Sequence, residues 1–179
     1  PQREKDLNGL QVFKKNQEGI AFGHQWKVNS DGFLGHNDKG GTNQLMIIGD
    51  SFIAGFHNPF GCKQSSIFKS YGFDVFEIGR PGITFIEAIE FYKFYEPLVN
   101  PHKTIFLIAN SDLKESIFEI KKKSDMSQFS VTTKEVYKGE IKAKRLKKVL
   151  YNFKTLYYLF LKYKKSNNSS KTPFFNENT

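Results

Sequence analysis

The sequence predicts an α/β fold built on a parallel sheet, and three short apolar segments carry that prediction. They cover residues 45–48, 73–78 and 104–109. A run of apolar, strand-favouring residues without alternation is typical of a strand that is buried on both faces of a parallel sheet. Segments of helical character lie between the three runs. This order predicts right-handed crossovers and a doubly wound sheet.

Two helical segments separate the three strands. Residues 64–71 are compatible with a short helix. Residues 84–95 form the stronger candidate, because Thr84 can cap the helix and Glu87 stands three positions later, at the spacing of a capping box. The apolar side chains of this second helix are Ile86, Ala88, Ile89 and Phe94.

The segments on either side of this alternating region carry weaker patterns. Residues 1–44 are polar and rich in glycine, which predicts an irregular lead-in with one short strand near residues 19–22. Residues 114–139 contain a Lys-Lys-Lys run and a Ser/Thr-rich patch. This composition indicates an excursion or a mobile loop that leaves the sheet.

A long amphipathic helix is expected after this loop. Its apolar residues recur at intervals of three and four, and lysines occupy the opposite face. These apolar residues are Leu146, Val149, Leu150, Phe153, Leu156, Tyr157 and Phe160. The α/β domain is therefore expected to cover residues 45–163, and a flexible Asn/Ser-rich tail is expected over 164–179.

The composition is that of a globular protein with an uneven charge distribution. At 179 residues and 39% hydrophobic content, the chain suits one domain with a substantial core. The 27 Lys and Arg against 18 Asp and Glu give a net charge of +9, and residues 113–179 carry the whole excess. Cys62 is the single cysteine, which excludes an intrachain disulfide. No apolar run approaches the roughly 18 residues of a membrane span.

Three loops follow the carboxyl ends of the predicted strands. They read Gly-Asp-Ser (49–51, the first loop), Ile-Gly-Arg-Pro-Gly (78–82, the second loop) and Asn-Ser-Asp (110–112, the third loop). In an open parallel sheet such loops share one edge and build the functional site. A serine hydroxyl, a glycine amide and a side-chain amide together offer a nucleophile and hydrogen-bond donors for a developing oxyanion. This combination points to acyl transfer.

The order of these loops resembles the GDSL or SGNH hydrolases, a family of esterases and acyltransferases. The stretch NSDGFLG at 29–35 resembles a polar segment that precedes the serine loop in the extracytoplasmic bacterial branch of that family, although Leu34 stands where arginine is usual. The resemblance covers about residues 26–116, the first half of a typical domain. It implies a flavodoxin-like three-layer sandwich with a parallel sheet.

The resemblance assigns roles to residues of the first and second loops. Ser51 would be the nucleophile, and its own backbone N–H would donate to the oxyanion. Gly82 would supply a second backbone N–H, and Gly79 would help to shape the turn. Asp50 is expected to organise the first turn rather than to act as a base, because it precedes Ser51 and would point away.

The third loop contains two candidates for the side-chain donor. Asn110 best matches the family's asparagine, which supplies a side-chain donor to the oxyanion. The family usually reads Asn-Asp, whereas this chain reads Asn110-Ser111-Asp112. Ser111 is therefore the alternative occupant of the donor position.

The expected catalytic base is missing from the sequence. The family supplies it from an Asp-x-x-His near its carboxyl terminus, and this chain has no such motif. His102 is expected at the opposite end of the sheet from Ser51, because a six-residue strand spans about 20 Å. His57 and His36 lie nearer and are expected to be exposed loop residues, and His24 also lies upstream. Either the chain stops before the last third of the domain, which we favour, or the fold is complete and inactive.

The basic helix over 146–160 suggests contact with a charged partner. Aromatic residues at helical spacing are usually core and lysines on the other face are usually solvated, so nucleic-acid binding is not expected. Contact with an anionic membrane surface suits the same pattern. No His, Cys, Asp or Glu residues have the spacing of metal ligands, and no metal or other cofactor is expected.

The expected function is that of a serine-dependent O-acyl ester hydrolase or acyltransferase. The resemblance implies that its substrate is an acylated carbohydrate or a similar small ester, and that it acts outside the bacterial cytoplasm. A non-catalytic binding domain on the same scaffold is the alternative.

Overall fold

The computed structural model describes residues 2–6, 8–35, 43–123 and 125–141. The chain divides into two units, Pro1–Lys142 and Ala143–Thr179, and the described residues all belong to the first. The amphipathic helix expected over 146–160 and the tail expected over 164–179 lie outside the described residues. In the part of the chain that is described, no helix has the length and apolar character needed to cross a bilayer.

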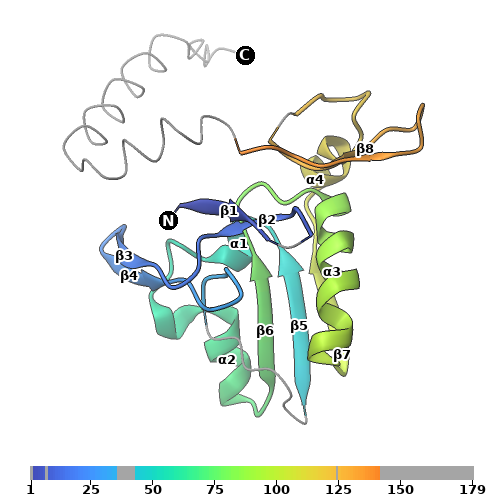
Figure 1. Cartoon of the computed structure of the whole chain (residues 1–179). Helices are drawn as coiled ribbons and strands as arrows, with labels where there is room; N and C mark the ends of the chain where they lie inside the picture. The colour runs from blue at the N-terminus through green and yellow to red at the C-terminus, as the bar shows by residue number, and fades with distance from the viewer. Residues whose placement is uncertain (1, 7, 36–42, 124, 142–179) are drawn as a thin grey trace, which may run out of the picture. The chain divides into compact units, whose positions relative to one another are not determined.

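A three-stranded parallel sheet forms the centre of the first unit (Figure 1). Its strands are β5 (Gln44–Gly49), β6 (Asp74–Gly79) and β7 (Lys103–Leu107), in the spatial order β6-β5-β7. The three predicted strands are confirmed within one or two residues, and the mixed α/β class with them. β5 is buried along its whole length because it has a neighbour on each side and helices over both faces.

Helices cover the two faces of the sheet. α3 (Phe85–Val99) packs on one face, and α1 (Ser51–Ala54) and α2 (Gln64–Ser70) lie on the other (Figure 1). The predicted capping box is confirmed: the Thr84 hydroxyl accepts from the backbone N–H of Glu87, and the Glu87 carboxylate accepts from the N–H of Thr84. Two short helices, α1 and α4 (Asn110–Glu115), and a 3-10 turn, η1 (Phe60–Cys62), were not predicted.

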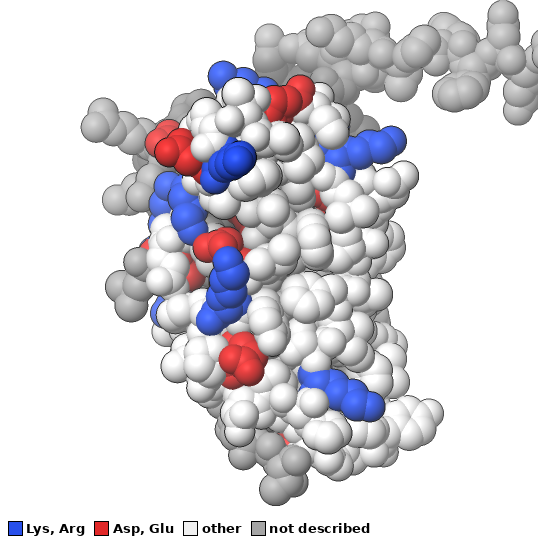
Figure 2. Space-filling view, turned by 90° about the vertical axis from the view of Figure 1, so that its right-hand side faces the viewer, with Lys and Arg blue, Asp and Glu red and all other residues white. Residues whose placement is uncertain are grey.

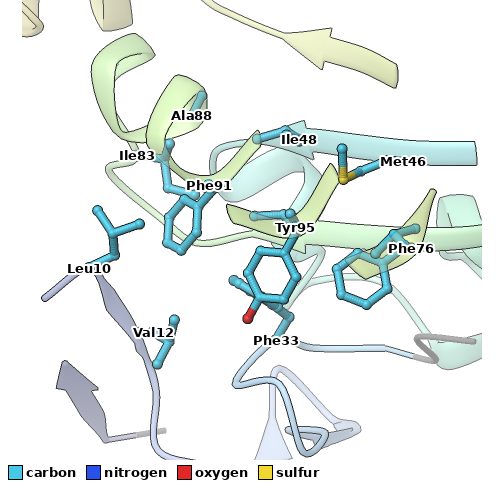
Figure 3. Close-up of a cluster of buried hydrophobic side chains, with 12 residues drawn as sticks. Leu10, Val12, Phe33, Met46, Ile48, Phe76, Ile83, Ala88, Phe91 and Tyr95 are labelled. Carbon is cyan, nitrogen blue, oxygen red and sulfur yellow. The ribbon is translucent and has the colours of Figure 1, made fainter. Parts of the chain in front are cut away.

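The main core lies between α3 and the sheet, and the N-terminal segment closes it. Leu10, Val12 and Phe33 pack into this cluster (Figure 3). Most of the described residues in 1–44 lie outside strands, as expected, but this segment is more regular than predicted. Its described residues include two antiparallel hairpins, of which only the strand near 19–22 was predicted. The four strands are β1 (Arg3–Lys5), β2 (Gln11–Phe13), β3 (Glu18–Ala21) and β4 (His24–Lys27).

β7 does not fit the prediction of strands buried on both faces, whereas β6, the other outer strand of the sheet, is buried over most of its length. Ile105, Phe106 and Leu107 are 37%, 36% and 47% exposed. Tyr92 of α3 contacts the Phe106 ring with centroids 5.7 Å apart, so α3 covers one face of β7 in part. Figure 2 views the molecule from the side of α3 and shows mixed charges beside an area that holds few of them. An apolar sequence run thus marks the strand correctly but does not indicate how far other elements cover its faces.

The excursion after α4 is tied to the rest of the unit rather than loose. It contains the two-residue strands β8 (Gln128–Phe129) and β9 (Val136–Tyr137), which pair with each other. The Thr84 hydroxyl donates to the backbone oxygen of Ser127 over 2.7 Å in a buried position. The expectation of a mobile loop over 114–139 is thus corrected by an ordered hairpin that is anchored at the start of α3.

Glu119 holds the turn of this hairpin, and we predict that its carboxylate titrates far below the usual range. Hydrogen bonds from the Ser130 hydroxyl and from the backbone N–H groups of Val131 and Thr132 lower the pKa of Glu119 to about 2. An unfolded glutamate titrates near 4.5. The stabilisation is therefore complete above that value and is lost as the pH falls through about 2.

The amide resonances of Val131 and Thr132 report this titration. In a pH series followed by NMR, both should move with a midpoint near pH 2 in the parent protein and should not move in Glu119→Gln. A midpoint near 4.5 would show that these hydrogen bonds do not form in solution.

Candidate active site

The three candidate loops lie at the same end of the sheet, where the carboxyl ends of its strands meet. Gly49, the last residue of β5, pairs in parallel with Gly79 of β6 and with Leu107 of β7. The arrowheads of β5 and β6 point to this edge in Figure 1, and α1 and the β1–β2 hairpin lie beside it. Because the strands end in register, the residues that follow each of them start from the same level. The fold therefore brings the first, second and third loops together.

Ser51 opens α1 and is exposed to solvent. Asp50 is the N-cap of this helix, and its Oδ1 accepts from the backbone N–H of Phe52 over 3.0 Å. The Ser51 hydroxyl donates to Asp50 Oδ2 over 3.4 Å, which is long for an O–H···O bond and therefore weak. Asp50 thus has the turn-organising role that the sequence indicates, and the Ser51 oxygen remains accessible.

The glycines of the first two strand ends allow α1 to approach the sheet closely. A Cβ on Gly79 would lie 2.4 Å from the backbone N of Ala54 and 2.6 Å from the carbonyl carbon of Ile53. A Cβ on Gly49 would lie 2.7 Å from Ile53 Cγ1. Gly79 is the last residue of β6 and not a residue of the turn. Its role is to let the helix that carries Ser51 rest directly on the strand.

Gly82 lies in the second loop with φ +76°, a value that favours glycine. Its backbone N–H makes no hydrogen bond with any described residue. Met126 of the excursion lies over it, since Met126 Cε is 2.9 Å from the position of a Cβ on Gly82. Sequence reasoning did not find Met126, because nothing in residues 114–139 indicates where that segment returns.

The third loop forms the first turn of α4, where Asn110 and Ser111 are both exposed. The Asn110 side chain makes no hydrogen bond with the described residues. The Ser111 side chain instead interacts with the Asp112 carboxylate, and this interaction lowers the pKa of Asp112. Asn110 is therefore the freer donor of the two candidates, and its assignment to the oxyanion stays a prediction.

Asp112 was not predicted as part of the site. Burial raises its pKa, a hydrogen bond from the backbone N–H of Ala109 lowers it, and the charges of Asp50 and Glu115 raise it. The influence of Asp50 on Asp112 shows that the first and third loops are electrostatic neighbours. A negative environment of this kind favours a protonated base beside Ser51 and opposes an oxyanion unless several donors face it.

A buried ion pair underlies the second loop. Arg80 Nη2 lies 2.6 Å from Glu87 Oε2, and both side chains are fully buried. The Ser127 hydroxyl donates to the other oxygen of Glu87 over 3.1 Å. Arg80 Nε has no hydrogen-bond partner among the described residues. This pair connects the second loop, the start of α3 and the excursion; the sequence identified Glu87 only as a capping residue.

No histidine in the described part of the chain hydrogen-bonds Ser51. The backbone N–H of His102 donates to Gln44, the first residue of β5, so His102 lies at the opposite end of the sheet, as predicted. His57 is exposed and its ring lies against Phe22 with centroids 4.0 Å apart. His24 lies in β4, and His36 is outside the described residues.

A small cleft lies elsewhere, between the β3–β4 hairpin and the loop after α1. Its lining includes Trp26, Leu34, Phe56 and Lys63, and none of the candidate site residues. Lys63 is buried there and donates to the backbone oxygens of Leu34 and Ala54. Burial lowers the pKa of Lys63, and the nearby charge of Glu77 partly offsets this. These hydrogen bonds of Lys63 therefore support the segment after α1, and Ser51 does not line the cleft.

The arrangement at the sheet edge provides an exposed hydroxyl with donors at the ends of neighbouring strands. Comparison with family models, with curated proteins and with solved structures yields no match to this chain, so the geometry and the residues themselves are the basis for a functional proposal.

Proposed function

We propose that this chain carries the nucleophile and the oxyanion-binding half of a serine-dependent O-acyl ester hydrolase or acyltransferase. The supporting observation is that an exposed serine shares one sheet edge with donors that are not used elsewhere in the described structure. These donors are the N–H groups of Ser51 and Gly82 and the side-chain amide of Asn110. The proposal includes the finer assignment of the sheet to the flavodoxin-like fold of SGNH hydrolases.

The proposed reaction begins with attack of Ser51 Oγ on the ester carbonyl. The carbonyl oxygen becomes an oxyanion and accepts hydrogen bonds from the three donors. The Ser51 proton passes to a base and then to the departing alcohol as the ester C–O bond breaks. Water or an acceptor hydroxyl then attacks the acyl-serine. Attack by water gives hydrolysis, and attack by an acceptor hydroxyl gives acyl transfer.

The base is the part of the mechanism that the described residues do not supply. Asp50 is the acceptor nearest to the Ser51 hydroxyl, and its position at the N-cap engages its other oxygen. We therefore expect slow ester cleavage by the 179-residue chain and faster cleavage when a diffusible base such as imidazole is added. An acylated carbohydrate or similar small ester, and a location outside the bacterial cytoplasm, remain proposals that rest on the sequence resemblance.

Covalent labelling of Ser51 tests the proposal. A fluorophosphonate probe should modify Ser51, imidazole should accelerate the modification, and Ser51→Ala should abolish it, as measured by intact mass and peptide mapping. Asn110→Ala should slow labelling by about 10²–10³-fold, the effect of removing one oxyanion donor. Ser111→Ala is the matched control and should leave the rate within about twofold of the parent rate.

Two results would contradict the esterase proposal: labelling that persists in Ser51→Ala, and labelling that is absent with and without imidazole. An Asn110→Ala rate equal to the parent rate would contradict the assignment of Asn110 as an oxyanion donor. The absence of a described base next to Ser51 favours one second candidate, a binding domain that holds acyl esters without cleaving them. Saturable binding of a small ester by NMR, combined with no labelling, would support that alternative.

A further inference from the structure

The peptide unit between Pro81 and Gly82 links an anchored oxygen to an unused donor. The carbonyl of Pro81 and the N–H of Gly82 belong to the same planar group, and no peptide bond in the described residues is cis. In a trans peptide the C=O and the N–H point in opposite directions. Whatever holds the Pro81 oxygen therefore determines the direction of the Gly82 N–H.

Two arginines hold that oxygen. Arg80 Nη1 donates to it over 3.2 Å, and Arg3 Nη2 donates to it over 3.1 Å. Arg80 belongs to the same loop, whereas Arg3 comes from β1, 78 residues away along the chain. The oxygen is thus fixed from two independent parts of the fold, at the end of the peptide unit opposite to the Gly82 N–H.

The Arg80 guanidinium is held by an ion pair, and the backbone of Arg3 is held by strand pairing. Arg80 is fully buried against Glu87, with a separation of 2.6 Å. Arg3 lies in β1, where it pairs with Phe13 of β2 in an antiparallel hairpin. A donor fixed in this way does not need to reorganise when charge develops on a ligand, and such preorganisation is the main source of oxyanion stabilisation in enzymes.

The two hydrogen bonds also change the chemistry of the peptide. Both come from charged groups, so they are stronger than ordinary backbone hydrogen bonds. A carbonyl that accepts strong hydrogen bonds polarises its amide, and the N–H of the same peptide becomes a better donor. The Gly82 N–H is polarised in this way, and it has no hydrogen-bond partner among the described residues.

We infer that Arg3 and Arg80 are positioning residues, which orient and polarise the Pro81–Gly82 peptide so that the Gly82 N–H serves as an oxyanion donor. This inference rests on the proposed function for its catalytic part. Its geometric part concerns one amide and can be measured whether or not the chain cleaves esters. Arg3 is the better probe of the two, because Arg80 also carries the buried ion pair.

The test compares Arg3→Gln with Arg3→Lys and with Lys5→Gln. Lys5 lies in the same strand, is exposed and makes no hydrogen bond to Pro81, so Lys5→Gln is the matched control. In ¹⁵N–¹H NMR spectra, the Gly82 amide nitrogen should shift in Arg3→Gln, shift less in Arg3→Lys and stay unchanged in Lys5→Gln. The rate of Ser51 labelling in imidazole should fall about tenfold in Arg3→Gln and recover in part in Arg3→Lys.

The outcomes separate the inference from the proposed function. An unchanged Gly82 resonance in Arg3→Gln overturns the inference, whatever the labelling rate. A shifted resonance with an unchanged labelling rate of Ser51 also overturns it, because the amide would then play no part in catalysis. A shifted resonance in a protein that shows no Ser51 labelling in any variant supports the anchoring of the peptide and contradicts the esterase proposal.

Discussion

Arg80→Met is expected to lower the free energy of unfolding by about 3–5 kcal/mol, the cost of leaving one member of a buried ion pair without its partner. Methionine has a similar volume and no charge, so the loss comes mainly from the electrostatics. In this variant Glu87 keeps the hydrogen bond from the Ser127 hydroxyl, but its charge stays buried without a cation. Urea unfolding at neutral pH measures the difference.

Lys93→Met is the matched control for this loss. Lys93 forms an ion pair with Glu90 over 3.1 Å on the surface of α3, the helix that contains Glu87. The Lys93 side chain is 66% exposed. Exposed pairs of this kind contribute at most about 1 kcal/mol. A loss in Arg80→Met that is no larger than in Lys93→Met would show that Arg80 and Glu87 are not buried together in solution.

A double variant distinguishes charge from packing at this site. In Arg80→Met/Glu87→Met both charges are absent, so part of the stability lost in Arg80→Met should return, as it does when buried ion pairs are replaced by apolar groups. No recovery would mean that poor packing, together with the capping-box and Ser127 hydrogen bonds that Glu87→Met also removes, outweighs the buried charge. The result also bears on the second loop, because the guanidinium that pairs with Glu87 also donates to the Pro81 oxygen.

The sequence predicts the elements whose signals are local. Each predicted strand is a short apolar run, and the start of α3 is identified by two residues, Thr84 and Glu87, whose side chains form the capping box. The exposure of β7 could not be predicted in the same way. β6 is also an outer strand and is buried, so exposure depends on which elements pack over a strand, and the composition of Ile105 or Phe106 does not encode that packing.

The site is predictable to a similar degree. Ser51 and Asp50 follow a strand within two residues, so their place at the sheet edge is a consequence of local order. The contacts from Arg3 and Met126 to the second loop join residues that are distant along the chain. Each depends on how a separate hairpin docks, and no motif marks such docking. Glu87 is an intermediate case, because the sequence predicts its capping role and does not predict its ion pair with Arg80.

Gly79→Ala is the second substitution with a large expected effect, and it tests the contact on which the position of Ser51 depends. The new Cβ would lie 2.4 Å from the backbone N of Ala54, and backbone atoms cannot move aside as a side chain can. Overpacking of this kind costs about 1–3 kcal/mol of stability. α1 must also move away from β6, and a displacement of about 1 Å at a reacting group can reduce a rate about 10²-fold.

Gly61→Ala separates this contact from the general effect of replacing glycine. A Cβ on Gly61 would have no neighbour within 4 Å, and Gly61 is not among the residues with positive φ. We therefore expect Gly61→Ala to unfold within about 0.5 kcal/mol of the parent protein and to keep its rate of Ser51 labelling. Gly79→Ala should lose both stability and labelling. Equal stabilities of the two variants would show that α1 does not rest on the end of β6, and Ser51 would then lack the support that the proposed site requires.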